Sequence, residues 1–500
     1  MTQSKILQDR MYIIILCVFL LSYIFWMLNI FEPDFFHMAN TGRELLTDLS
    51  NLYHNDNFII SGYDTLIQQW LYCIIIYKVY DVFGYNGITF LILLQFSILC
   101  FVYSKLSQEF GVSKKMSIIV ALLAIIPFDY LNIRPQMFSI TLLCIELIIL
   151  KRCIKYKTYK SLYFLPILTL IEMNFHMTFW VFHYIVILPY IFPLKAIYKG
   201  ITNCECDLVE EKIPIIKLIV PLILMTLTLF MNPYGLKGIK CLFDSASIKD
   251  LQMFELTAPP IVSEDFTAVL LGTAVLLYVY FIKQLNTADA LLFLGLAFLN
   301  TLAVRNCTFY SLACVYSCSL FFKHQDITNL EKYLFQKTKK IFLIFISMLL
   351  IYLPIKASFS LKLGKTLPKD ILIYLQNNEE DLSDVSIFAD LNVSSYFLWE
   401  GVGKTFAESK TEPYLKTING KQDILKDYSY YTKYATTEEL DNFFELYKFD
   451  YVCIPSGYTT LRNYFSSNNK DYVLVCTDTN KTTIYNHDIP LWQLYKYQGG

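Results

Sequence analysis

The chain has 500 residues, of which 55% are apolar, 16% aromatic and only 17% charged. Soluble proteins carry about 25% charged residues, so this composition excludes an ordinary soluble protein and indicates an integral membrane protein. The formal net charge of −1 provides no field that would favour nucleic acid as a partner.

Apolar runs that approach the length of a membrane span, about 17–25 residues, predict a mainly α fold: a polytopic transmembrane bundle of about eleven helices. No small-residue cleavage site follows the first run, which we therefore interpret as a retained helix. In chain order, the runs are residues 11–30, 86–103, 116–131, 137–150, 161–173, 177–192, 215–231, 266–282, 288–304, 309–322 and 341–355.

Basic residues are densest in the loops 151–160 and 323–340. The positive-inside rule places such loops in the cytoplasm, together with the N-terminus. This topology requires residues 66–84 to form an amphipathic helix on the outer surface instead of a crossing. It predicts a multi-pass protein of the cell membrane with an extracytoplasmic C-terminal region.

With this topology, polar and ionisable side chains gather at the outer ends of the predicted helices. Ionisable groups at such depth are costly and are candidates for function, so we predict a shared outer pocket. The alternative for each residue is a helix cap or a local hydrogen bond. The residues are Glu32, Asp34, His37, Asp129, Arg134, Asn174, His176, Asn232 and Arg305.

The composition becomes soluble-like after the last apolar run. We therefore predict a transmembrane domain over residues 1–358, with its first outer loop at 31–85, and an extracytoplasmic α/β domain over 359–500.

Within this tail, residues 386–390 and 450–454 read as strands, and 472–477 with 482–486 as a hairpin. Thr436 and Glu439 have the spacing of a capping box that opens a helix. A disulfide between Cys453 and Cys476, on two predicted strands, is left open.

The order of several motifs resembles that of bacterial polytopic membrane proteins related to the GT-C glycosyltransferases. This superfamily includes the protein O-mannosyltransferases and the aminoarabinose transferase of lipid A. The chain departs from the group's tail pattern where Glu408-Ser409-Lys410 stands for Asp-x-Arg and where Ser395 stands for glycine. The matching motifs are Asp34, His37 and Gly42; Gln69-Trp70-Leu71; Arg134-Pro135-Gln136; Asn174-Phe175-His176; Asn232-Pro233-Tyr234-Gly235; and tail segments 388–390, 395–399 and 408–414.

The resemblance implies transfer of a sugar from a polyprenyl-phosphate carrier to an outer-surface glycan, lipid or protein. Asp34 is the expected general base, which takes the acceptor proton in an inverting displacement. Asp129 stands where some relatives keep a second acid. His37 and His176 are expected to orient the acceptor or, in an alternative, to hold a divalent metal together with Asp34.

The substrate-binding residues that we predict supply charge and hydrogen bonds to the donor. A guanidinium matches phosphate oxygens in two-point geometry, so either Arg134 or Arg305 is expected to hold the lipid phosphate. The predicted set is completed by Glu32, Asn174, His176 and Asn232.

Two further hypotheses stand beside the transferase. The first is a non-enzymatic carrier or assembly factor for polyprenyl-linked cell-surface glycans. The second, a secondary transporter, is disfavoured because no internal repeat is found and Glu146 is the one acid deep in an apolar run. His183, in the middle of a run, reads as a packed polar residue. Only the enzyme requires the carboxylate of Asp34 for turnover.

Overall fold

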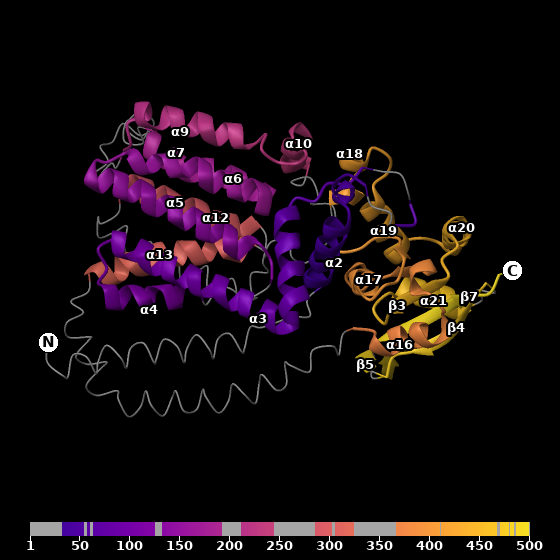
Figure 1. The fold of residues 1–500 in the computed structure, drawn as a ribbon. Helices are drawn as coiled ribbons and strands as arrows, with labels where there is room; N and C mark the ends of the chain where they lie inside the picture. Colours follow the sequence, from indigo (N-terminus) through magenta and orange to yellow (C-terminus); the bar gives the residue numbers. More distant parts are fainter. Residues whose placement is uncertain are drawn as a thin grey trace, which may run out of the picture. The chain divides into compact units, whose positions relative to one another are not determined.

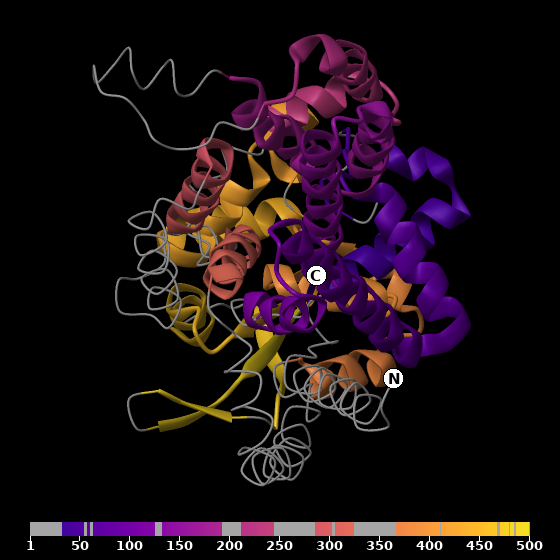
Figure 2. The same cartoon turned by 90° about the vertical axis from the view of Figure 1, so that its left-hand side faces the viewer.

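The structure is a computed structural model, and it describes the chain in twelve ranges. Glu32, Asp129, Arg305 and the predicted helices 11–30, 266–282 and 341–355 lie outside them. The described residues are mainly α-helical with a small sheet, which confirms the mainly α prediction (Figures 1 and 2). The ranges are 33–54, 58–60, 64–125, 133–192, 212–244, 286–302, 306–324, 367–410, 412–467, 471–479, 481–484 and 487–499.

The chain divides into two compact units. The first unit comprises residues 1–29, 89–232 and 252–361, and the second comprises 30–88, 233–251 and 362–500. The second unit thus unites the first outer loop with the C-terminal region. The domain boundary at 358 stays a prediction.

Helices make up the described part of the first unit, and they coincide with eight of the predicted apolar runs. Each run is predominantly apolar, as expected of a helix that is buried or lies in lipid. The elements are the second arm of α3 (Trp70–Glu109), α4 (Lys114–Ile125), α5 (Gln136–Tyr156), η2 (Lys160–Phe164), α6 (Leu165–Phe175), η3 (Met177–Phe179), α7 (Trp180–Ile191), α9 (Ile215–Thr228), α12 (Thr287–Leu302) and α13 (Cys307–His324).

Helix α3 is, among the described residues, the one helix long and apolar enough to cross a membrane; it has 40 residues and contains an 18-residue window with a mean hydropathy of 2.0. It has a break at Gly84, where φ is 60° and ψ is −154°. Glycine adopts this conformation without the steric cost that other residues pay. The predicted surface helix 66–84 and the predicted span 86–103 therefore correspond to the two arms of one broken helix.

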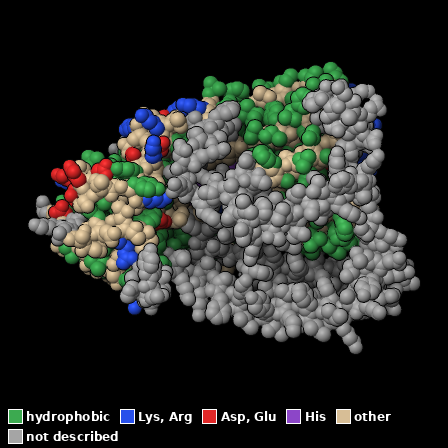
Figure 3. All heavy atoms as spheres, turned by 180° about the vertical axis from the view of Figure 1, so that it is seen from behind, with side chains coloured by type: hydrophobic (Ala, Val, Ile, Leu, Met, Phe, Trp, Pro, Cys, Tyr) green, Lys and Arg blue, Asp and Glu red, His purple; other side chains and the backbone are tan. Residues whose placement is uncertain are grey.

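An apolar surface covers part of the first unit. Figure 3 shows hydrophobic side chains gathered over its described helices, at the upper right. Exposed apolar surface of this extent marks contact with a membrane or another protein. On α9, the exposed large apolar residues are Ile215, Ile216, Ile219, Val220, Ile223, Leu224 and Leu227.

The second unit combines helices with a mixed sheet. The sheet order is β2-β1-β3-β7-β4, with β1 parallel to β2 and β3, and β7 antiparallel to β3 and β4. The strands are β1 (Ser386–Ala389), β2 (Lys404–Thr405), β3 (Tyr451–Pro455), β4 (Tyr472–Thr477), β5 (Lys481–Ile484), β6 (His487–Pro490) and β7 (Trp492–Tyr497). The helices are α2 (Pro33–Thr47), η1 (Leu49–Leu52), the first arm of α3, α10 (Leu236–Asp244), α16 (Lys369–Asn378), η7 (Leu382–Asp384), α17 (Leu391–Trp399), η8 (Glu412–Tyr414), α18 (Lys416–Asn419), α19 (Ile424–Lys433), α20 (Thr437–Tyr447) and α21 (Thr459–Ser467).

Local signals in the tail are confirmed. Strands β1, β3 and β4 lie where the sequence predicts them, within one residue at each end. Helix α20 begins with a capping box, in which the Glu439 side chain accepts a hydrogen bond from the Thr436 backbone nitrogen at 2.8 Å. Both backbone donors of the box are satisfied, as in other capping boxes.

The predicted hairpin is wrong. Strand β4 pairs with β7, and β5 pairs with β6 in a separate ribbon. Strand β7 inserts between β3 and β4, where Trp492, Leu494 and Tyr495 are buried. The turn residues at 479–481 favour local pairing, but the burial of β7 decides the partner.

No disulfide joins Cys453 and Cys476, both of which are free cysteines. Each of them lies opposite Leu494, on either side of β7. Two strand spacings amount to about 9–10 Å, which exceeds the reach of a disulfide.

The core of the second unit is aromatic. Phe388 contacts Phe443 and Phe444 in edge-on geometry, with ring centroids 5.7 and 5.8 Å apart. Phe58 of the first outer loop joins this core against Tyr414, at 5.1 Å. The first outer loop is therefore folded together with the tail.

Helix α2 packs closely against the first arm of α3 at Gly42. A Cβ atom at this position would lie 2.2 Å from the carbonyl oxygen of Cys73 and 2.8 Å from Cβ of Tyr77. We expect Gly42→Ala to lower the stability of the second unit by about 1–3 kcal/mol or more, because the backbones must separate. The measurement is the melting temperature of the purified full chain in detergent.

The matched control is Gly295→Ala on α12, where an added Cβ meets nothing within 4 Å. This change is expected to raise stability by about 0.5–1 kcal/mol, since alanine is the better helix former. Equal effects of the two substitutions would contradict the close approach at Gly42.

Candidate active site

Helix α2 presents two ionisable side chains in its first turns. Asp34 lies in the first turn and His37 three residues later, so both project from one face. The Nδ1 atom of His37 lies 3.9 Å from Oδ1 of Asp34. Pro33 opens the helix, and a carboxylate near a helix N-terminus is stabilised by the helix dipole.

Side chains from two other segments hold the His37 ring. Nε2 of His37 lies 3.2 Å from the amide nitrogen of Gln69, and Nδ1 lies 3.2 Å from Oγ of Ser409. In this orientation the Gln69 amide donates to Nε2, which leaves the hydrogen on Nδ1. Nδ1 then faces both Ser409 and the Asp34 carboxylate. The ring is buried, whereas the Asp34 side chain is 19% exposed.

Ser409 belongs to the tail segment in which the chain departs from the resembling group. Its Oγ lies 2.7 Å from Oγ of Ser395 on α17, which in turn lies 3.2 Å from Oε2 of Glu408. The backbone nitrogen of Glu408 donates to the hydroxyl of Tyr414 at 2.9 Å. A chain of hydrogen bonds thus connects His37 with a buried carboxylate of the tail.

Lys410 and Glu408 form a buried ion pair, with Nζ and Oε1 2.8 Å apart and side chains 5% and 0% exposed. Burial by itself would lower the pKa of the Lys410 ammonium. The opposing fields of Glu408 and Glu44 outweigh burial, so the pKa lies above its ordinary value. Lys410 therefore remains charged and neutralises Glu408 next to Ser409.

Arg43 connects α2 with the C-terminal end of α17 through hydrogen bonds. Its guanidinium donates to the carbonyl oxygens of Leu398 and Trp399 at 3.1 and 3.2 Å, and lies 4.9 Å from the Trp399 ring centroid. Carbonyl groups at a helix C-terminus have no partner within the helix, so this arginine satisfies them. Burial raises the pKa of the neighbouring Glu400 carboxyl, and Arg43 offsets part of that rise.

These partners were not assigned roles from the sequence. Ser395 and the segment 408–414 were matched only as motifs, and Gln69 only as part of a helix. Arg43 had no signal at all, because the two carbonyl groups that it binds on α17 lie more than 350 residues away in the chain.

The described ones among the predicted residues of the first unit lie at or next to the ends of its helices. Asn174 donates to the carbonyl oxygens of Leu170 and Met231 at 2.9 and 3.0 Å, and Asn232 donates to that of Leu229 at 2.5 Å. These bonds connect α6 with the end of α9. Arg134 lies just before α5 and is partly buried. The pocket shared by all predicted residues stays a prediction.

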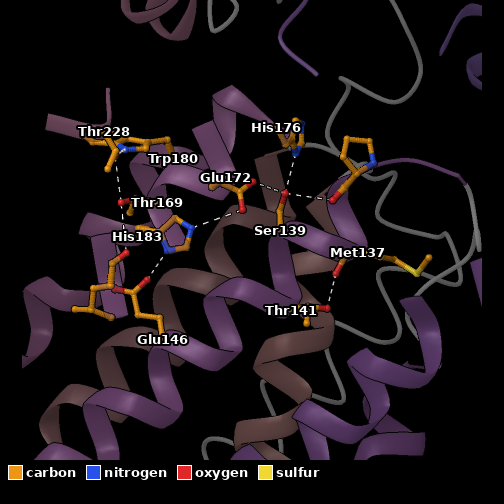
Figure 4. A network of polar contacts seen from close by, with 12 residues as sticks. Met137, Ser139, Thr141, Glu146, Thr169, Glu172, His176, Trp180, His183 and Thr228 are labelled. Atoms are coloured by element: carbon orange, nitrogen blue, oxygen red, sulfur yellow. Dashed lines mark hydrogen bonds and ion pairs between the residues drawn. The ribbon is translucent and has the colours of Figure 1, made fainter. Parts of the chain in front are cut away.

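His176 ends α6, where its Nδ1 lies 3.0 Å from Oγ of Ser139. The same hydroxyl donates to Glu172 at 2.5 Å, and the opposite oxygen of Glu172 faces His183 (Figure 4). The sequence did not single out Glu172. No group of three His, Cys, Asp or Glu side chains able to hold a metal occurs within the described ranges.

No protein-family model and no curated protein sequence matches the chain. Similar solved structures include the oligosaccharyltransferase of Archaeoglobus fulgidus tethered to an acceptor peptide containing the NVT sequon. The alignment with this structure has a TM-score of 0.56 and 10% sequence identity, and it covers 89% of this chain and 69% of the oligosaccharyltransferase chain. The same protein in its apo form has a TM-score of 0.55 and 11% identity, with equal coverage. The chain is therefore similar in fold to this oligosaccharyltransferase.

Proposed function

From the GT-C-like fold that this chain shares with the archaeal oligosaccharyltransferase, we propose that it is a membrane glycosyltransferase. It moves a sugar from a polyprenyl-phosphate carrier to a glycan, lipid or protein on the outer surface. The single observation that carries the proposal is the Asp34–His37 pair on α2, because it supplies a partly exposed carboxylate beside a fixed imidazole.

In this function Asp34 is the general base. It takes the proton of the acceptor hydroxyl while the oxygen attacks the anomeric carbon, and the lipid phosphate leaves from the opposite face. The His37 ring lies beside this carboxylate, with Nδ1 3.9 Å from Oδ1 of Asp34, and Gln69 and Ser409 hold the ring in place. Asp129 is the proposed second acid.

Donor binding is assigned to the predicted polar residues of the helix ends. Arg134 or Arg305 holds the lipid phosphate, because a guanidinium binds two phosphate oxygens at once. The remaining proposed contacts are Glu32, Asn174, His176 and Asn232.

The proposed location is the cell membrane, with several passes, a cytoplasmic N-terminus and an extracytoplasmic tail. The exposed apolar side chains of α9 and the length of α3 support a membrane location. The basic loops of the sequence support the orientation.

A second candidate is a non-enzymatic carrier or assembly factor for polyprenyl-linked glycans. The close bonding of His37 to the tail favours it, because the polar cluster then serves to join α2 to the tail. In that case no residue of the cluster is needed for turnover.

The test deletes the protein in its native cell and compares surface glycans and polyprenyl-phosphate sugars by mass spectrometry. We expect the loss of one surface glycan together with accumulation of one lipid-linked sugar, both restored by the wild-type chain. Unchanged profiles would overturn the proposal. Loss of the glycan that is fully restored by a chain lacking the Asp34 carboxylate would replace it with the assembly factor.

A further inference from the structure

A chain of polar side chains runs through the interior of the first unit. The proposed function uses only one of them, His176. It connects three helices: Glu146 and Ser139 of α5, Glu172 of α6 with His176 at its end, and His183 of α7 (Figure 4). Four of these side chains are fully buried, and His176 is 6% exposed. Buried ionisable groups are costly and require an explanation.

One end of the chain holds two carboxyl groups around one imidazole. Nδ1 of His183 contacts Oε2 of Glu146, and Nε2 lies 3.6 Å from Oε2 of Glu172. The phenol of Tyr184 on α7 lies 2.8 Å from Oγ1 of Thr226 on α9. The neighbouring Lys151 of α5 is matched by Asp289 of α12 at 2.7 Å. If Glu146, Glu172 and His183 were all ionised, the cluster would carry one uncompensated negative charge. Electroneutrality therefore places at least one proton on the two carboxyl groups.

The other end of the chain passes through the hydroxyl of Ser139. Its Oγ lies 2.5 Å from Oε1 of Glu172, 3.0 Å from Nδ1 of His176 and 3.2 Å from the carbonyl oxygen of Pro135. The hydroxyl has one hydrogen to donate. Its direction therefore depends on whether Glu172 accepts or donates.

The two arrangements give His176 opposite properties. With Glu172 ionised, Ser139 donates to the carboxylate, His176 donates from Nδ1, and Nε2 is a base. With Glu172 protonated, the carboxyl donates to Ser139, the hydroxyl donates to Nδ1, and the hydrogen of His176 is on Nε2, where it is an acid.

We propose that Glu172 and Ser139 form a proton relay that sets the tautomer of His176, with Glu146 and His183 exchanging the proton of Glu172. In one passage, the Nε2 hydrogen of His176 moves to a ligand oxygen, the Ser139 hydrogen moves to Nδ1, and the Glu172 proton moves to Oγ. Glu172 ends as a carboxylate, and the other two groups stay neutral. Ser139 and Glu172 are positioning residues that act through His176.

The ligand oxygen is assigned to the departing lipid phosphate, and this assignment rests on the proposed function. A phosphodiester that loses its sugar becomes a monoester that can take up one proton. The relay supplies that proton from the buried carboxyl groups, while the acceptor proton goes to Asp34. The relay itself does not depend on which ligand is bound.

The test is solid-state NMR of the full chain in lipid bilayers, with ¹⁵N-labelled histidine. The chain has six histidines, and the His176 signals are assigned from their loss in His176→Gln. Imidazole ¹⁵N shifts distinguish the two tautomers directly. In the wild type we expect His176 to change tautomer as the pH is varied.

Ser139→Ala is expected to abolish this pH-dependent change, because the hydroxyl bridge is lost. Glu172→Gln is expected to hold one tautomer at every pH, since its amide does not titrate. The matched control is Thr141→Val, which removes a buried hydroxyl of the same helix that donates only to the carbonyl oxygen of Met137, at 2.7 Å. Signals of the other histidines report that each variant is folded.

A His176 titration that is the same in Ser139→Ala as in the wild type would overturn the relay. If Ser139→Ala does not fold, a His176 titration that is the same in Glu172→Gln as in the wild type would overturn the relay. Because no donor or acceptor is needed, the relay stands or falls separately from the proposed function. A working relay in a protein without transferase activity would remove only its assignment to the lipid phosphate.

Discussion

Asp34→Asn is expected to lower turnover by about 10²–10⁴-fold, which is the usual contribution of a positioned general base. Asparagine has the shape of aspartate, so α2 keeps its structure, but the amide cannot take the acceptor proton. The assay uses membrane vesicles of the deletion strain that carry either variant at equal abundance. It follows the glycan that the deletion removes.

The control for this substitution is Asp48→Asn, directly after helix α2. Asp48 is exposed, and its carboxylate accepts from the backbone nitrogen of Ser50 at 2.8 Å, where it caps η1. Turnover with this variant is expected to equal that of the wild type. Wild-type turnover with Asp34→Asn would show that another group is the base, and His37→Gln would then identify whether the imidazole acts directly.

Lys410→Met is expected to destabilise the second unit by about 3–5 kcal/mol, because it leaves the Glu408 carboxylate buried without its partner. The effect is measured as the melting temperature of the purified full chain. Adding Glu408→Gln to Lys410→Met is expected to recover much of the loss, since the double variant contains no buried charge. Additive losses from the two changes would contradict the ion pair.

Lys404→Met is the matched control for Lys410→Met. Lys404 lies on β2 in the same segment and is exposed, so the change is expected to stay within about 0.5 kcal/mol.

The pH dependence of the pair follows from the raised pKa of Lys410. The contribution of the ion pair to the stability of the folded state is fully present below the unfolded-state pKa of 10.5. It is lost as the pH rises through the higher pKa of Lys410 in the folded state. The loss of stability caused by Lys410→Met should therefore be constant from about pH 6 to about pH 9. A deficit that vanishes within this range would contradict the charged state of Lys410.

The elements of the fold were predictable where the signal lies within a few residues. Apolar runs predicted eight described helices, and the spacing of Thr436 and Glu439 predicted the start of α20. Hydrophobic periodicity and capping are properties of a single segment, so one sequence reveals them. The pairing of β4 with β7 was missed, because a strand's partner depends on which strand buries its face best.

The candidate site shows the same division. The sequence by itself singled out Asp34 and His37, three residues apart directly after the first apolar run, and assigned them to an outer loop. Only the tertiary structure decided that both residues lie on helix α2 and that Ser409 contacts the imidazole. It also decided that Ser395 connects Ser409 with the carboxylate of the Lys410–Glu408 ion pair. Contacts across more than 350 residues depend on packing of the whole unit, and no local pattern of residues encodes them.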